Sequence, residues 1–484
     1  RRFIYEGKYR QIIAPKRSSS HKNSIMEVEA KYLPEDKITS LSRWLLNFSQ
    51  EFDLNDKTHV RAIYSRVSDA QYFQEIARTN TNTEALNSSL TISYEDKDNH
   101  LNATILTEDA QVINAGKPGY TRAIQGSISK TFNADKKLPI GVSAVSTRFT
   151  HDVENKESGT RTYGEIGASR KLNIDYPQIT PRANVSITNY SLKNNPDINR
   201  TIFGSGLDFD FTYYRNAYMF GYKVNHQIKP IISYNYRAKK LQGNIPIFDS
   251  TDKYDDIISF ADLTSGERYT GLDRITNAND ITLSLQSNYR KVDAFEDEKD
   301  LLSMKIAQTY FTDNEVVSDS ANTNFETRKT YSDIAASIDI AVNHFSVSSA
   351  AQFNPDTSRL VKKENKISYS PSSKKFISLS FIDEGSKETE KIYGAYPITE
   401  SVHIFGGLDK TTSTGITNAE TTGVAYESCC WAFRLAHFKE DNSNGGHNYS
   451  TGMELVLTGL GSTSSPLKGK IEGYIPGYAA KLRE

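Results

Sequence analysis

The chain has 484 residues, with 58 Lys and Arg against 59 Asp and Glu, so its formal net charge is -1. This balance argues against a nucleic-acid-binding protein, because such proteins usually carry a clear excess of basic residues. Only 37% of the residues are hydrophobic, and no run of about 18 apolar residues occurs, which excludes membrane-spanning helices. Yet 28 Tyr and 22 Phe are spread along the chain, which argues against disorder.

Strict alternation of apolar and polar residues recurs from one end of the chain to the other. Successive side chains of a β-strand point to opposite faces, so each stretch predicts a strand with one apolar and one largely polar face. The clearest stretches are residues 90–94, 183–187, 207–213, 334–342, 377–381 and 453–457. Helical spacing is hard to find over any long window, so we expect an all-β protein.

The connections between these stretches are uneven in length. Residues 96–100 and 354–357 form short turns, whereas residues 239–279 and 312–331 form long loops. Transmembrane barrels combine strands of about 9–11 residues with short turns and long outer loops. An open sheet of this size would expose its edges, so it must close or split. The pattern favours a large antiparallel transmembrane β-barrel of about two dozen strands, with residues 1–484 as one barrel domain.

A soluble all-β protein, either several sandwiches or a solenoid, is the alternative. No linker rich in Pro, Gly or Ser divides the chain, which argues against sandwiches. No repeat with a fixed period of about 20–50 residues recurs, which argues against a solenoid. A barrel with apolar side chains outside and polar side chains inside also explains the hydrophilic composition, with the aromatic residues as girdles at the two membrane interfaces.

The only two cysteines, Cys429 and Cys430, are adjacent. Neighbouring cysteines rarely bond to each other because the small ring strains the peptide between them. They are therefore two thiols or two half-cystines whose partners lie elsewhere. No spacing typical of a metal site is present, and we expect no catalytic residues, metal or cofactor.

Four groups of residues, in order along the chain, carry a resemblance to a known family. Near the C-terminus, residues 426–434 read YESCCWAFR, followed by a last amphipathic strand and by Gly459, Leu460 and Gly461. The other groups are MEV, YLP, RW, VSD and YF within residues 26–73, IPIFDS, YTGLDRI and NAN within residues 245–279, and AQTYF at residues 307–311. Together they resemble the lipopolysaccharide-assembly (LptD) family of Gram-negative outer membranes.

The resemblance implies a non-enzymatic translocon that inserts lipopolysaccharide into the outer leaflet through a barrel lumen and a lateral seam. It implies a barrel plugged by the lipoprotein LptE and a periplasmic jellyroll domain that receives lipopolysaccharide from the bridge protein LptA. Membrane lipid and the barrel-assembly machinery are further expected partners, and no nucleic acid is. Residues 2–10 resemble a strand near, but not at, the start of the family's barrel. We therefore expect the jellyroll and the first strand or two to be absent from this sequence.

The resemblance also assigns roles to particular residues. It makes Cys429 and Cys430 half-cystines bonded to cysteines of the N-terminal domain, which an oxidising compartment favours. The last strand would form one side of the seam with Gly452, Met453, Glu454, Leu455, Val456, Leu457 and Thr458. A long loop folded into the barrel mouth would include Pro246, Phe248, Asp249, Ser250, Gly271, Asp273, Arg274 and Asn277.

Two alternatives stay open at this point. Asp273 and Arg274 form either part of an ordered loop or an ion pair on the surface, where such a pair contributes little. In function, the alternative to a lipopolysaccharide translocon is a general outer-membrane solute channel or a receptor-type barrel. An outer-membrane barrel enzyme is disfavoured because no Ser/His/Asp or His/Asp constellation stands out.

Overall fold

The computed structural model describes most of the chain. The described residues are 4–13, 24–37, 40–73, 85–113, 119–134, 138–151, 156–172, 174, 176–253, 257–291, 300–313, 315–318, 324–327, 330–428, 430–442, 446–457 and 466–478. Their secondary structure is almost entirely strand, with two short helices, α1 (Phe260–Ser265) and α2 (Pro466–Tyr474). Neither of these helices has the length and hydrophobicity needed to cross a membrane.

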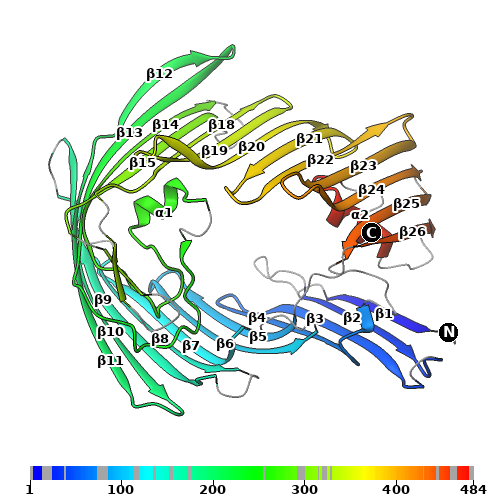
Figure 1. Ribbon diagram of the computed structural model, residues 1–484, viewed down its shortest axis with the longest axis horizontal. Helices are drawn as coiled ribbons and strands as arrows, with labels where there is room; N and C mark the ends of the chain where they lie inside the picture. The colour runs from blue at the N-terminus through cyan, green and yellow to red at the C-terminus, as the bar shows by residue number, and fades with distance from the viewer. Residues whose placement is uncertain are drawn as a thin grey trace.

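One antiparallel sheet of 24 strands makes up the wall of the molecule. Nearly every strand pairs with the next along the chain, the exceptions being that β11 and β12 both pair with β13 and that β15 pairs with β18. The sheet curls around a central space (Figure 1). Its strands are β1 (Tyr5–Ile13), β2 (Ser24–Leu33), β3 (Arg43–Asn55), β4 (Thr58–Val67), β5 (Ala85–Asp96), β6 (Leu101–Val112), β7 (Thr121–Phe132), β8 (Ile140–Thr150), β9 (Gly159–Ser169), β10 (Gln178–Leu192), β11 (Ile198–Asp210), β12 (Tyr213–Met219), β13 (Tyr222–Arg237), β14 (Ala278–Lys291), β15 (Asp300–Phe311), β18 (Ile334–Val342), β19 (Phe345–Asn354), β20 (Arg359–Ser372), β21 (Lys375–Asp383), β22 (Glu388–Pro397), β23 (Val402–Thr411), β24 (Ile416–Glu427), β25 (Trp431–Asn442) and β26 (Gly446–Leu457).

The prediction of an all-β antiparallel sheet of about two dozen strands is confirmed by this pairing. Two helices that sequence analysis did not place, α1 and α2, also occur. Both are short, and α1 is fixed by a local cap rather than by a long periodic pattern. The Oγ of Ser259 accepts a hydrogen bond from the N–H of Asp262, and the Asp262 carboxylate accepts one from the N–H of Ser259.

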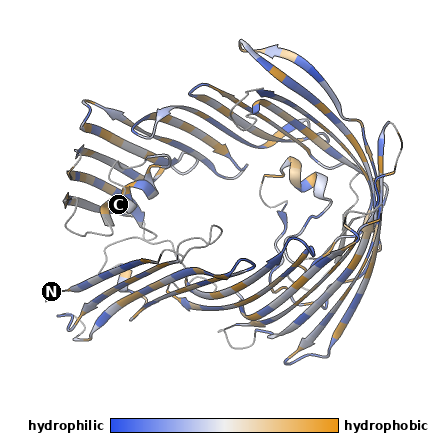
Figure 2. Cartoon of the chain, turned by 180° about the vertical axis from the view of Figure 1, so that it is seen from behind, coloured by the Kyte–Doolittle hydropathy of each residue, from blue (hydrophilic) through white to orange (hydrophobic). Residues whose placement is uncertain are grey.

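The two faces of the wall differ in the way that the alternation predicts. On β14, Leu283 and Leu285 are exposed on the outside, and Leu283 retains 53% of its accessible surface. The intervening side chains of Thr282 and Ser284 are buried. A soluble sheet would bury its apolar face, and here the apolar face is the exposed one. Figure 2 shows the same alternation of hydrophobic and hydrophilic residues along the strands around the ring.

Strands β11 and β12 share one place in the wall. Residues 204–210 of β11 pair with residues 231–237 of β13, and β12 pairs with residues 222–228 of the same strand. The β12–β13 hairpin therefore extends beyond its neighbours, as Figure 1 shows at the top of the view. A separate two-stranded sheet, β16 (Glu315–Ser318) with β17 (Asn324–Thr327), lies in the connection between β15 and β18.

The two edge strands of the sheet are β1 and β26. Among the described residues, β1 pairs only with β2 and β26 only with β25. The two edges lie on the same side of the ring in Figure 1, so the described strands form a curled but incomplete ring. Inside it lie the connection from β13 to β14, which carries α1, and helix α2 near β24 to β26.

Candidate functional site

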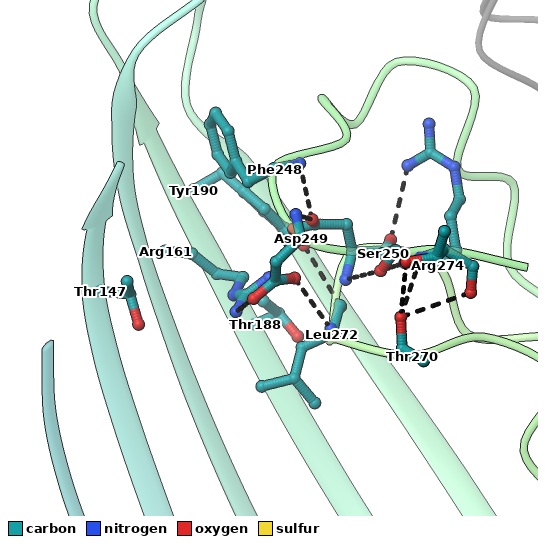
Figure 3. A network of polar contacts seen from close by, with 12 residues as sticks. Thr147, Arg161, Thr188, Tyr190, Phe248, Asp249, Ser250, Thr270, Leu272 and Arg274 are labelled. Carbon is teal, nitrogen blue, oxygen red and sulfur yellow. Dashed lines mark hydrogen bonds and ion pairs between the residues drawn. The ribbon is translucent and has the colours of Figure 1, made fainter. Parts of the chain in front are cut away.

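The connection between β13 and β14 folds back into the ring and contacts its inner wall; we call residues 239–277 the inner loop. The described part of this loop contains α1 and otherwise few regular hydrogen bonds between backbone groups. Such a segment needs side chains to satisfy its buried N–H and C=O groups. Arg200 of β11 and carboxylates of the loop itself bind such groups. Arg161 of β9 and Tyr190 of β10 in turn bind the Asp273 carboxylate, and Figure 3 shows both of them beside the loop.

Asp273 lies at the centre of the network and is fully buried. Its Oδ2 accepts hydrogen bonds from the backbone N–H of Phe248 at 2.7 Å and of Asp249 at 2.8 Å. Its Oδ1 accepts one from Nη1 of Arg161 at 2.7 Å and one from the hydroxyl of Tyr190 at 3.1 Å. One carboxylate thus joins two separate parts of the inner loop to strands β9 and β10.

Arg161 on β9 binds a second carboxylate in the same place. Its Nη1 and Nη2 donate to Oδ1 and Oδ2 of Asp249 at 2.6 and 2.7 Å. This is the two-pronged geometry in which a guanidinium binds a carboxylate most strongly. The Cζ of Arg161 also lies 5.0 Å from the centre of the Phe149 ring, within cation–π range. The single positive charge therefore neutralises part of the charge of the buried Asp273 and the half-buried Asp249.

Arg200 on β11 satisfies the loop's carbonyl groups rather than its acids. Its Nη1 donates to the backbone oxygen of Asp273 at 2.8 Å and to Oε1 of Gln242 at 2.6 Å. Its Nη2 donates to the backbone oxygen of Leu272 at 2.6 Å. Gln242 in turn accepts from the N–H of Ile275 at 3.0 Å. The backbone of residues 272–275 is thereby bound both through its C=O groups, at Leu272 and Asp273, and through its N–H group at Ile275.

A tight turn at Gly271 brings the two halves of the loop together. Gly271 has a φ of +65°, a conformation that costs an ordinary side chain free energy. A Cβ added there would collide with the backbone and side chain of Asp249. The hydroxyl of Ser250 accepts from the N–H groups of Asp273 and Arg274 at 2.9 and 3.1 Å. Residues 249–250 and 271–274 therefore pack as one unit.

Apolar side chains complete the contact between loop and wall. The ring of Phe248 stacks on Phe149 with centroids 4.6 Å apart, and it meets Tyr120 edge to face at 4.9 Å. Ile245 and Tyr190 belong to the same buried cluster. Burial of such side chains contributes about 1.5–3 kcal/mol each, so the loop is held by apolar packing as well as by charge.

Burial and the Arg161 charge act in opposite directions on the two loop acids. Burial alone would raise the pKa of Asp249, but its hydrogen bonds and ion pair with Arg161 outweigh burial and lower it. Burial raises the pKa of Asp273, and the attraction of Arg161 offsets only part of that increase. Asp249 is therefore the more acidic of the pair.

Comparison with known proteins identifies the family of the chain. The family LptD, described as LPS transport system D, matches residues 42–403, about three quarters of the sequence. The chain belongs to the LptD family. A relative from Shewanella frigidimarina, named LPS-assembly protein LptD, is 27% identical over 91% of this chain and 61% of that protein. A protein of the same name from Burkholderia lata is 23% identical over 93% of this chain and 59% of that protein. The chain thus spans about three fifths of the length of these LptD relatives.

Solved structures with a detectable likeness are barrels of other families. A mutant porin of Rh. blastica has 11% identity and a TM-score of 0.23, over 65% of this chain and 98% of the porin. The ferric-catecholate import receptor Fiu from E. coli K12 has 10% identity and a TM-score of 0.26, over 86% of this chain and 71% of the receptor. At these TM-scores the fold assignment depends on the strand pairing and not on either likeness.

The structure brings most of the loop residues selected from the LptD resemblance into one network. Phe248, Asp249, Ser250, Gly271 and Asp273 contact one another directly or through one shared partner. Nη2 of the nearby Arg274 donates to the backbone oxygen of Ile245 at 2.8 Å. Pro246 and Asn277 lie half-buried at the two ends of this region.

Asp273 and Arg274 do not form an ion pair on the surface. Both are buried, at 0% and 3% exposure, and the Asp273 carboxylate pairs with Arg161. Sequence analysis missed the wall residues Arg161, Tyr190 and Arg200 of this site, and Gln242 of the inner loop. The available signal was the position of the arginines, since Arg161 and Arg200 alternate with the exposed apolar residues Ile166 and Phe203 of the same strands and therefore face the other way.

The other predicted residues lie away from the inner loop. Cys430 is exposed in the turn between β24 and β25, where its N–H donates to Oγ of Ser428 at 3.3 Å. Because neighbouring strands are antiparallel, this turn and the inner loop lie at opposite ends of the wall. Cys429 lies outside the described residues, so the half-cystine assignment stays a prediction.

The predicted seam residues occupy β26, an edge strand of the described sheet. The side chains of Met453 and Leu455 are exposed on the outside, at 73% and 62%. Gly452 and Glu454 alternate with them and face inward, where Glu454 pairs with Arg434 at 2.9 Å. Val456 and Leu457 complete the strand by pairing with Ala432 and Trp431, and Thr458 lies outside the described residues.

Proposed function

We propose that this chain forms the outer-membrane barrel of a lipopolysaccharide translocon. The observation that carries the proposal is the inverted wall, apolar and exposed outside, polar and buried inside, in a chain that belongs to the LptD family. Such a wall suits an environment of lipid outside and water inside. We infer an integral location in the Gram-negative outer membrane, with residues 1–484 as the barrel domain.

The chemistry of lipopolysaccharide explains why both faces are needed. Each CH₂ group of an acyl chain costs about 0.8 kcal/mol to expose to water, so the lipid part needs an apolar route. The sugar and phosphate groups need a wet wall that offers hydrogen bonds. Two cavities along the inner loop offer such walls: one of about 650 Å³ lined in part by Arg182, Asn184 and Glu267, and one of about 970 Å³ lined in part by Glu108 and Arg122.

We further propose that lipopolysaccharide leaves through a seam that has β26 as one side. An edge strand is the natural place for a lateral opening, because fewer interstrand hydrogen bonds must be broken there. We also propose the wider assembly that the family resemblance implies, with LptE inside the lumen and LptA at a jellyroll domain. The process is transport and not catalysis, and the described residues contain no group of three or more side chains suited to hold a metal ion.

The proposal is tested with a photocrosslinking amino acid placed at Met453 or Leu455 in cells that assemble the full complex. We expect crosslinks to lipopolysaccharide at both positions, and far fewer from Ile187 on β10. Ile187 is a matched control because it is an outward-facing apolar residue with 56% exposure on a distant strand. Equal capture at Ile187 and Leu455 would contradict the seam. A purified complex that conducts ions through an open pore would favour the solute-channel alternative.

The role of the cysteines is tested separately by alkylation without reduction. Two half-cystines predict no labelling of Cys429 or Cys430 in the mature full-length protein, and labelling of both after reduction. Labelling of both residues before reduction would contradict the proposed disulfides.

A further inference from the structure

The segment that follows β26 lies on the inner wall of the last strands; we call residues 466–478 the C-terminal brace. It consists of α2 and one further turn, closed by hydrogen bonds from the N–H of Ile475 to the oxygen of Ile471 and from Tyr478 to Ile475. Leu467, Ile471 and Ile475 are spaced four residues apart, so they form one stripe along the helix. Lys470, Tyr474 and Tyr478 form a second, adjacent stripe with the same spacing.

The apolar stripe packs into a cluster that lines β21 to β25. Ile471 and Ile475 have no exposed surface, and Leu467 packs against the same cluster. The wall side of the cluster is made of Phe376, Ala395, Phe405, Ala425, Ala436 and Phe438. This is an apolar patch on the inner face of the wall, and the brace covers it as the inner loop covers Phe149 and Tyr190.

Small residues in the wall make room for the brace. A Cβ at Gly452 of β26 would lie 2.6 Å from Cδ1 of Leu467, and one at Gly407 of β23 would lie 3.5 Å from the backbone oxygen of Tyr474. A side chain at Gly452 would therefore push Leu467 away from the wall, whereas a Cβ at Gly407 would reach ordinary van der Waals contact with the brace. The wall and the brace fit each other closely on two strands that are three places apart in the sheet.

The second stripe binds polar groups of the wall. Nζ of Lys470 lies 3.0 Å from Oε1 of Glu440 on β25 and donates to Oγ of Ser450 on β26 at 3.2 Å. The hydroxyl of Tyr474 donates to the same Glu440 carboxylate. Tyr478 hydrogen-bonds through its hydroxyl to Nε2 of His403 on β23 at 2.6 Å. These contacts join the brace to β23, β25 and β26.

Strand β26 is held at three consecutive inward-facing positions. Ser450 binds Lys470, Gly452 receives Leu467, and Glu454 pairs with Arg434 of β25. Arg434 is itself buried and pairs with Glu427 of β24 at 3.1 Å. An edge strand has backbone hydrogen-bond partners on one side only. The contacts from the lumen hold β26 in addition to its pairing with β25.

We propose that the C-terminal brace fixes β26 to β25, so that β26 is the stationary side of the lipopolysaccharide seam. This inference rests on the proposed function, because it assigns a mechanical role to one side of the proposed opening. The seam opens by movement of the strand on its other side, while β26 stays in the sheet. The brace residues are positioning residues, since they act on the seam through β26.

Hydrogen–deuterium exchange of the full complex tests the brace. Ile471→Asp places a charge in the apolar cluster, and we expect β26 amides to exchange at least tenfold faster than in the parent protein. Exchange in β10 and β11 should not change. Gly469→Ala is the matched control on the same helix, because a Cβ at Gly469 meets no atom within 4 Å.

A milder pair of substitutions covers the case in which Ile471→Asp prevents assembly. Gly452→Val should speed exchange in β26 because it displaces Leu467, and adding Leu467→Ala should reverse much of that effect by restoring the space. Faster exchange in the brace itself, with β26 unchanged, would overturn the inference. So would equal acceleration of β26 by Gly469→Ala.

The two proposals fail in different ways. If lipopolysaccharide is not captured at Leu455 in the protein with an intact brace, the proposed seam is contradicted, whatever the exchange data show. Normal capture at Leu455 together with exchange in β26 that does not respond to Ile471→Asp or Gly452→Val would contradict the brace alone.

Discussion

Nη1 of Arg161 on β9 lies 2.7 Å from Oδ1 of Asp273 in the inner loop, although 112 residues separate the two in the sequence. Both residues are almost completely buried. A buried ion pair is favourable only when the remaining donors and acceptors are also satisfied. Asp249, Tyr190 and two backbone N–H groups provide those partners, which makes this pair the main polar attachment of the loop to the wall.

Replacing the central acid should detach the loop. Asp273→Ala leaves the N–H groups of Phe248 and Asp249 without their acceptor, and we expect a loss on the order of 3 kcal/mol in the free energy that holds the loop in place. The measurement is limited proteolysis between residues 245 and 275 in the folded barrel. Asp356→Ala, at an exposed turn, is the control and should leave cleavage unchanged.

Arginine and lysine should not be interchangeable at position 161. Arg161→Lys keeps the positive charge but cannot bind Asp249 with two parallel hydrogen bonds and Asp273 with a third. We expect a loss of about 1.5–3 kcal/mol, seen as faster amide exchange in residues 245–250 and 271–275. Exchange as slow as in the parent protein would show that charge alone holds the loop.

The turn at Gly271 should tolerate no side chain. Gly271→Ala combines an unfavourable positive φ, which costs about 1 kcal/mol, with a collision against Asp249. Gly415→Ala is the matched control, because Gly415 also has a positive φ of 73° but its Cβ would lie in open space. Proteolysis of the inner loop should increase strongly for Gly271→Ala and not for Gly415→Ala. Equal behaviour of the two variants would mean that the collision is relieved elsewhere.

The inner loop should detach from the wall only when the pH is low enough to protonate Asp249. The pKa of Asp249 is lowered in the folded protein, so its stabilising contribution is complete above the ordinary Asp value of about 3.9 and is lost as the pH falls through the lowered value. Asp273, whose pKa is raised, takes up its proton first and does so without loss of stability. We therefore expect the loop to resist proteolysis at pH 5 and to become sensitive below about pH 4.

An Asp249→Asn variant separates this effect from general acid unfolding. In this variant the inner loop should resist proteolysis less at neutral pH, and its resistance should not fall further as the pH falls from 5 to 3. The measurement at the lowest pH uses a protease that is active in acid, such as pepsin. If Asp249→Asn becomes sensitive to proteolysis at the same pH as the parent protein, a group other than Asp249 causes the transition.

The wall could be predicted from the sequence because its signal is local. Alternation within residues 183–187 or 377–381 determines which side chains face outward, and most strands then pair with their neighbour along the chain. The prediction of one continuous strand over residues 207–213 is wrong, because β11 ends at Asp210 and β12 begins at Tyr213. The apolar and polar alternation continues through residues 211–212, so nothing in the pattern marks the break or the shared position of the two strands.

The site could be predicted only on the loop side. Asp249, Asp273 and Gly271 stood out in a long loop, but Arg161 lies in an ordinary alternating strand with nothing local to mark its partner. Helix α2 was missed because nine residues are too few for a clear helical period beside a long β-pattern. The four-residue spacing of Leu467, Ile471 and Ile475 was the available signal.

The length of chain between Arg161 and Asp273 also dictates an order of assembly. The wall forms from hairpins whose strands are adjacent in the sequence, and such contacts close quickly. The inner loop can attach only after β9, β10 and β11 stand side by side, because its partners come from all three. An attached loop therefore reports correct assembly: if a protease leaves residues 245–275 intact, the quarter of the sheet from β9 to β14 has already found its register.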